Sequence, residues 1–171
     1  MYHFNGRYSY AETSGNIDAE MHDGTVDLFL RKNLFTSSTM YKVQHHNMDF
    51  SLLAMGMKTT NHSFHQQFSF AVTDKLSAVA GLRWDRNNQK YLDKRLIYYG
   101  GLLFNLFDSP KFKVSLFGSY GETETAYMSE EVQNTFLYSD FPSVDDYDSD
   151  FAYFNQTLNW NITDTVTFSE Q

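Results

Sequence analysis

The sequence predicts an all-β protein, with one domain over residues 1–171 built as an antiparallel up-and-down β-barrel. Three observations carry this prediction. Segments of about ten residues alternate apolar and polar side chains, aromatic residues make up 18% of the chain, and short and long connections alternate between the segments. Strands of about ten residues with this dyad repeat cross a bilayer when tilted. The predicted barrel is therefore of the transmembrane, outer-membrane type.

The clearest strand runs from Leu76 to Trp84, where every second side chain is apolar and the side chains between include Ser77, Gly81 and Arg83. Successive strand residues point to opposite faces, so this segment has one apolar and one polar face. The same alternation along the chain predicts strands near residues 2–11, 18–32, 36–46, 61–73, 75–86, 94–107, 111–121, 151–163 and from 165 onward.

The connections fall into two kinds. Compact turn chemistry occurs around Asn33 and at residues 73–75, 108–110 and 163–165, where Asp, Asn, Ser, Thr and Pro favour tight turns. Longer connections are expected at residues 12–18, 46–61, 86–93 and 121–150. An up-and-down barrel of the outer-membrane type has this alternation of short turns and long loops.

Two places fit the pattern less well. The segment Asp49 to Lys58 is apolar on both parities, which suggests a further strand buried on both faces or a segment packed over the rim. Leu103 and Phe107 would face the lumen if Phe104 and Leu106 face lipid.

The expected strand count is nine, whereas bacterial single-chain barrels have even numbers of strands. Because the last strand stops at Gln171 without a terminal aromatic residue, we expect a truncated barrel that lacks one or more C-terminal strands. The chain opens directly in a strand pattern, so we expect an exported protein whose signal peptide is absent from this sequence.

Composition excludes some classes of partner. The net charge of -8 argues against a nucleic-acid partner, and the absence of cysteine removes disulfide frameworks and thiolate metal sites. A mean hydropathy of -0.49 would ordinarily indicate a soluble protein, but a barrel exposes only alternate residues to lipid and averages polar. We expect no cofactor, and outer-membrane lipid as the surroundings. The sequence does not determine the oligomeric state.

A family resemblance adds to this reading. The segments that carry it are Tyr10 to Asp18 with its Ser-Gly-Asn turn, Thr73 to Leu76, Gly81 to Arg86, and Tyr99 to Pro110. In order and spacing they resemble the YdiY-like family of salt-induced outer membrane proteins of unknown function. The resemblance is clearest over residues 5–130. It implies an outer-membrane β-barrel, with no established catalytic residues to carry over.

Charged residues on the polar parity are the candidate lumen or pore residues. Arg7, Arg83, Asp85 and Arg95 would meet inside a barrel, either as a plug of ion pairs or as the constriction of a small pore. We favour the plug because small barrels are filled by their own side chains. If a pore exists, Arg83 and Arg95 are its expected determinants.

Metal sites have weak candidates. Hard oxygen ligands for calcium are offered by Asp145, Asp146, Asp148 and Asp150, which make a divalent cation a candidate partner of the acidic loop. The loop lacks the glycine and terminal Glu of an EF-hand, so a solvated acidic loop is favoured. The histidine pairs 45/46 and 62/65 each point to opposite faces of a strand and do not converge.

Catalysis has no convincing candidate. Ser63 with His62 or His65, and His46 with Asp49, could be drawn as parts of a hydrolase site, but proximity in sequence does not make a triad. We therefore expect a non-enzymatic protein and assign no catalytic residue.

The function that we expect is that of an outer-membrane β-barrel of a Gram-negative bacterium, serving envelope integrity, stress adaptation or limited, porin-like passage of small solutes. The alternative is a soluble lipocalin-like barrel that binds an apolar ligand, with its apolar parity turned inward. Parity along each strand is the same in both. Aromatic residues near strand ends and the alternating connections favour the membrane barrel.

Overall fold

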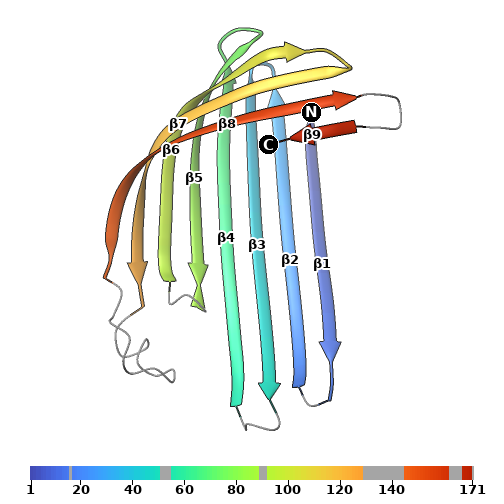
Figure 1. Ribbon diagram of the computed structural model, residues 1–171, viewed down its shortest axis with the longest axis vertical. Coiled ribbons are helices and arrows are strands. Elements are labelled where there is room, and N and C mark those ends of the chain that lie inside the picture. The colour runs from blue at the N-terminus through green and yellow to red at the C-terminus, as the bar shows by residue number, and fades with distance from the viewer. Residues whose placement is uncertain (16, 51–54, 89–91, 129–144, 162–166, 171) are drawn as a thin grey trace.

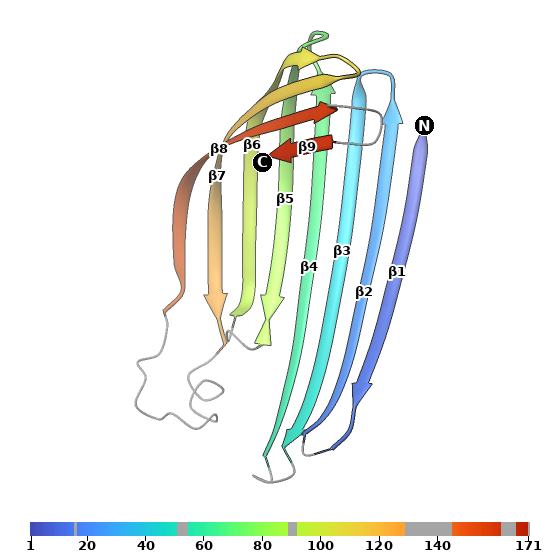
Figure 2. The ribbon, with the colours of Figure 1, turned by 45° about the vertical axis from the view of Figure 1, so that its right-hand side comes forward.

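The computed structural model describes residues 1–15, 17–50, 55–88, 92–128, 145–161 and 167–170, and these form one antiparallel sheet in which each strand pairs with the next along the chain. The sheet is curled, and β6 to β8 bend over at the end that carries the short turns (Figures 1 and 2). The nine strands are β1 (Tyr2–Thr13), β2 (Ile17–Lys32), β3 (Phe35–Phe50), β4 (Met55–Ala71), β5 (Leu76–Asn87), β6 (Leu92–Asp108), β7 (Phe112–Tyr127), β8 (Tyr147–Asn161) and β9 (Thr167–Glu170).

The prediction of an all-β, antiparallel, up-and-down protein is confirmed, and eight of the nine expected strands agree with the structure to within a few residues at most of their ends. Among the described residues, β1 pairs only with β2 and β9 only with β8, so the ladder of paired strands is open. No helix in the described part of the chain is long and apolar enough to cross a membrane.

The tight turns form where turn chemistry predicts them. Asn33 follows β2 with a φ of 52°, a left-handed conformation that Asn tolerates better than most residues. In the next turn, the hydroxyl of Thr73 accepts hydrogen bonds from the backbone N–H groups of Lys75 and Leu76. Ser109 likewise accepts one from the backbone N–H of Phe112. The expected turn at residues 163–165 lies outside the described residues.

The connections at the other end are shorter than predicted, because the strands continue into them. β1 reaches Thr13 before β2 begins at Ile17, and β5 reaches Asn87 before β6 begins at Leu92. The polar side chains of these segments resemble those of loops, but strand pairing satisfies their backbone groups instead. The connection between β7 and β8, which runs from residue 128 to 146, includes residues 129–144 that are not described.

The described parts of the segment Asp49 to Lys58 belong to two strands. β3 ends and β4 begins inside it, with Phe50 paired to Met55 across the hairpin. The expected further strand or rim cover is therefore replaced by two paired strand ends at residues 49–50 and 55–58, and residues 51–54 lie outside the described residues.

A β-bulge corrects the expectation for Phe107. Asn105 pairs with Ser115, but Phe107 pairs with Val114, so β6 carries one extra residue at this point. A bulge reverses the facing of the residues beyond it. Phe107 therefore lies on the same face as Leu102 and Phe104, whereas Leu103 stays on the opposite face.

The sheet has two chemically different faces. The inner face is the one hollowed by a cavity of about 720 Å³, and most of the buried side chains lie on it, including Ala19, Thr59, Val79, Asp85, Leu92 and Thr125. The outer face is the opposite one. It carries exposed large apolar side chains, among them Phe4, Tyr8, Leu28, Phe68, Leu102, Phe154 and Trp160.

Candidate functional site

The cavity of the inner face contains a cluster of charged side chains that centres on Asp85. Directly opposite partners place Lys42, Ser63, Asp85 and Arg95 in one row across β3, β4, β5 and β6. Cross-strand partners point to the same face, so all four side chains project toward the cavity. Arg83 joins them from two residues earlier on β5.

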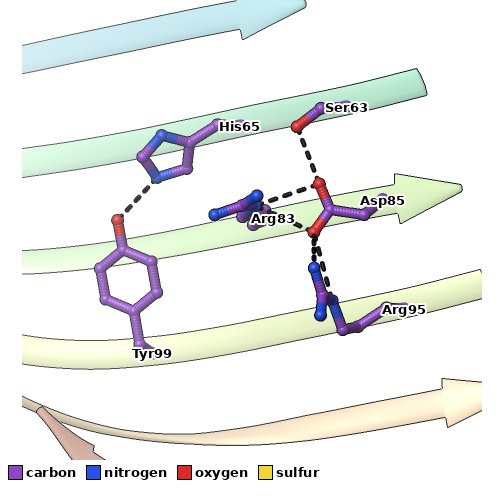
Figure 3. Close-up of polar contacts among 6 residues, drawn as sticks. All are labelled: Ser63, His65, Arg83, Asp85, Arg95 and Tyr99. Carbon is purple, nitrogen blue, oxygen red and sulfur yellow. Dashed lines mark hydrogen bonds and ion pairs between the residues drawn. The ribbon is translucent and has the colours of Figure 1, made fainter. Parts of the chain in front are cut away.

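The Asp85 carboxylate receives hydrogen bonds from three side chains (Figure 3). Arg95 donates to Oδ2 through Nη2 at 2.9 Å and through Nε at 3.3 Å. Arg83 donates through Nε to Oδ1 at 3.1 Å, and the same nitrogen lies 3.0 Å from Oδ2. The Ser63 hydroxyl donates to Oδ1 at 2.8 Å. Asp85 has only 8% of its side chain exposed, so these donors replace the water that the charge loses on burial.

Beside this cluster, a tyrosine on β6 reaches across β5 to β4. The Tyr99 hydroxyl donates to Gln67 Oε1 at 3.0 Å and lies 2.8 Å from His65 Nε2. A hydroxyl has a single proton, so His65 donates from Nε2 to Tyr99. Figure 3 shows the Tyr99 ring approaching β4 beside the charged cluster.

This crossing depends on a glycine. Gly81 is the partner of Tyr99 on β5, and a Cβ placed at Gly81 would meet the Tyr99 ring and hydroxyl. Only a residue without a side chain leaves room for the ring to lie over the strand. The sequence pattern marks Gly81 as a polar-parity residue, but it does not reveal this role.

Of the four predicted lumen residues, the structure brings three together. Arg83, Asp85 and Arg95 are in direct contact, whereas Arg7 lies on the same face but on β1, four strand spacings from Asp85. At about 4.8 Å between strands, that is roughly 19 Å of sheet. Arg7 makes no contact with the cluster within the described residues.

The other candidate residues do not assemble into a metal or catalytic site. Ser63 bonds Asp85, His65 bonds Tyr99 and His62 bonds the Tyr41 hydroxyl, so no serine–histidine pair forms among these residues. His46 Nε2 lies 3.6 Å from Asp23 Oδ1, and His46 and Asp49 point to opposite faces of β3.

The acidic candidates lie just before β8 and within its first residues. All four are exposed, and the backbone N–H of Tyr127 donates to Asp146. Asp148 and Asp150 face Glu124 and Glu122 across the outer face. The described residues contain no group of three or more His, Asp or Glu placed to hold a metal ion.

Comparison with known proteins gives one match. The profile of a family described as a protein of unknown function, DUF481, matches residues 6–171. The chain belongs to the DUF481 family. This confirms the resemblance to a family of unknown function and extends it beyond residue 130. No curated protein and no solved structure matches this DUF481 chain.

We predict that Gly81→Ala destabilises this DUF481 protein by about 1–3 kcal/mol, because the added methyl group would displace the Tyr99 ring. Gly100→Ala is the control, since a Cβ there meets nothing within 4 Å. That substitution should be neutral or stabilising, because alanine restricts the unfolded chain. Denaturant titration of both variants checks the difference, and equal stabilities would contradict the packing of Tyr99 over Gly81.

We predict that Asp85→Asn lowers the free energy of unfolding by about 1–3 kcal/mol, because two guanidinium groups and a hydroxyl lose their charged acceptor. The matched control is Asp27→Asn, on the inner face of β2 and without an ion pair to another described residue. It should change stability by less than about 0.5 kcal/mol. Similar losses in both variants would show that the cluster contributes nothing specific.

Proposed function

We propose that this protein is a non-enzymatic outer-membrane β-barrel, whose outer face contacts lipid and whose inner face lines a passage for small polar solutes in the cell envelope. The observation that carries the proposal is a band of apolar side chains on the outer face, which crosses the strands at the slant expected of a membrane barrel. Membership of the DUF481 family and the antiparallel sheet are consistent with it.

The band has nearly the same length on several strands. On the outer face it runs over residues 2–10 of β1, 76–84 of β5, 112–120 of β7 and 152–160 of β8. Toward the long connections it gives way to charged residues, which are Glu12, Arg86, Glu122 and Asp150. Nine residues per strand match the roughly 9–11 that a tilted transmembrane strand needs.

Both edges of the band shift in the same direction across the sheet. The edge nearest the long connections lies at Tyr10 on β1 and at Tyr120 on β7. Directly opposite partners, followed strand by strand from Tyr120, lead to Tyr2 on β1. This edge therefore shifts by the eight residues between Tyr2 and Tyr10. The other edge shifts equally. It lies at Leu30 on β2 and at Trp160 on β8. The same series of opposite partners leads from Leu30 to Ala152 on β8, which is eight residues from Trp160.

This shift measures how strongly the strands would tilt in a bilayer. Eight residues at about 3.3 Å each, over six strand spacings of about 4.8 Å, correspond to a tilt of roughly 40°. Transmembrane barrels have strand tilts of about 35–45°. A flat bilayer would meet both edges of the band at this tilt, with aromatic residues such as Tyr10, Trp84, Tyr120 and Trp160 near its two interfaces.

Polar side chains that interrupt the band on β3 and β4 bond to one another. Thr39 donates to Gln66 Oε1, and the Gln66 amide donates to Ser37 at 2.9 Å. Polar groups in a hydrocarbon layer need internal partners, because lipid offers none. These contacts are therefore compatible with a lipid-facing surface.

The alternative, a lipocalin-like protein, requires apolar side chains in the cavity and polar ones outside. The cavity instead contains Lys42, Arg83, Asp85 and Arg95, while Leu102 on the outer face is 54% exposed. This orientation supports the membrane barrel over a protein that carries an apolar ligand in water.

The direct test is expression of the chain with a signal peptide, followed by separation of outer-membrane and soluble fractions and electrophoresis with and without heating. We expect recovery with the outer membrane and a heat-dependent change of migration. A stable monomer in the soluble fraction without detergent would overturn the proposal.

A substitution in the centre of the band sharpens this test. Leu102→Arg should reduce the folding stability in lipid vesicles by about 2–4 kcal/mol, the cost of an arginine near the bilayer midplane. The control Asp148→Arg lies on the outer face beyond the band and should cost less than about 1 kcal/mol. In a water-soluble protein, both positions would be exposed to water, and Leu102→Arg would cost no more stability than Asp148→Arg. Equal costs would therefore contradict a lipid-facing band.

A further inference from the structure

We propose that the cavity of the inner face binds a small organic carboxylate, with its charged group on Arg83, Arg95 and Lys42 and its apolar body against the wall formed by Ile97, Phe117 and Tyr153. The inference deepens the proposed function, because it names the class of solute that the lumen would take. Three features of the cavity support it: its charge, its unused hydrogen-bond donors and its aromatic wall.

The cavity is locally positive in a chain whose net charge is -8. Its lining includes three cationic residues of the inner face, Arg86 of the opposite face and one carboxylate. Arg86 is paired with Asp93 at 3.2 Å, and Asp85 is shared between Arg83 and Arg95. Lys42 forms no ion pair with any described residue. Among the described residues, one charge of the arginine pair and the charge of Lys42 are therefore left without an ion-pair partner.

Asp85 orients the two arginines without using all their donors. Arg83 contacts the carboxylate only through Nε, and Arg95 does so through Nε and Nη2. Each guanidinium has five N–H groups in a planar fork. Several of them make no hydrogen bond to a described residue and can donate to a ligand. The side chains of Arg83 and Arg95 are 48% and 40% exposed, which keeps those groups accessible.

Such a pair suits a carboxylate. Guanidinium groups bind carboxylates through two parallel hydrogen bonds, and these charge-assisted bonds are stronger than neutral ones. Other acidic groups of the inner face, Asp23 and Asp27, lie on β2, about 14 Å of sheet from Asp85 but diagonally opposite Lys42 on the neighbouring strand. Screening at physiological salt acts over about 8 Å, so they weaken the attraction little at the two arginines and more at Lys42.

An apolar wall begins beside the cationic residues. Ile97 is the direct partner of Arg83 and lies between Arg95 and Tyr99 on the inner face of β6. From there the rings continue across the sheet, with Tyr99 6.4 Å from Phe117 and Phe117 6.2 Å from Tyr153 between centroids. A volume of about 720 Å³ is within the range of small-molecule sites.

The test is equilibrium dialysis of benzoate against the full chain folded in detergent, corrected with protein-free micelles. Benzyl alcohol has the same ring without the charge, and inorganic phosphate has the charge without the ring. We expect benzoate to bind at least tenfold more tightly than either, and its affinity to fall when chloride is raised to about 1 M.

Two variants and one control locate the site. Arg95→Gln should weaken benzoate binding roughly tenfold, since it removes charged donors. Lys42→Gln should weaken it severalfold, and among the described residues Lys42 has no ion pair whose loss would disturb folding. Lys113→Gln lies on the same face near the short turns, where Lys113 pairs with Asp108 at 3.0 Å. It should bind benzoate as the unchanged chain does.

Heat-dependent migration of every sample separates this inference from the proposed function. A folded barrel that does not bind benzoate, that binds benzyl alcohol or phosphate equally well, or that loses binding equally with Lys113→Gln would overturn the carboxylate site and leave the barrel intact. Benzoate binding by a soluble chain without the heat effect would retain the site and overturn the membrane proposal.

Discussion

A continuous pairing register across the strands is the constraint on which the rest of this structure depends. A slip of one residue in any strand would move its apolar side chains from the outer to the inner face and would separate Asp85 from its partners. The bulge near Asn105 shows how exact this requirement is. One extra residue there restores Phe107 to the apolar face, whereas the alternation alone would have turned it inward.

The register also explains why charged and aromatic groups meet in the cavity. It aligns Lys42, Ser63, Asp85 and Arg95 across four strands, so that a buried carboxylate can hold two arginines in fixed positions. Gly81 then lets Tyr99 cross β5 and bond residues of β4. These contacts join side chains of β4, β5 and β6 on the inner face, in addition to the backbone hydrogen bonds that pair the strands.

Much of the fold could be predicted because its signals are local. Alternation over Leu76 to Trp84 and turn residues such as Asn33 and Thr73 determine strands and turns within a few neighbours. The largest errors in the predicted ends lie where polar strand ends resemble loops, as at the end of β7, which runs to Tyr127 and not to residue 121. For the site, parity correctly placed Arg83, Asp85 and Arg95 on one face, but it could not show that Arg7 lies four strands away.

The sequence by itself determined the fold class, the order of strands and the two faces, because side-chain alternation and turn chemistry act over a few residues. Only the tertiary structure decided the register between strands, and with it the Asp85 cluster, the crossing of Tyr99 over Gly81 and the slant of the apolar band. These features join residues of different strands, and their relative heights depend on pairing and bulges that no single segment encodes.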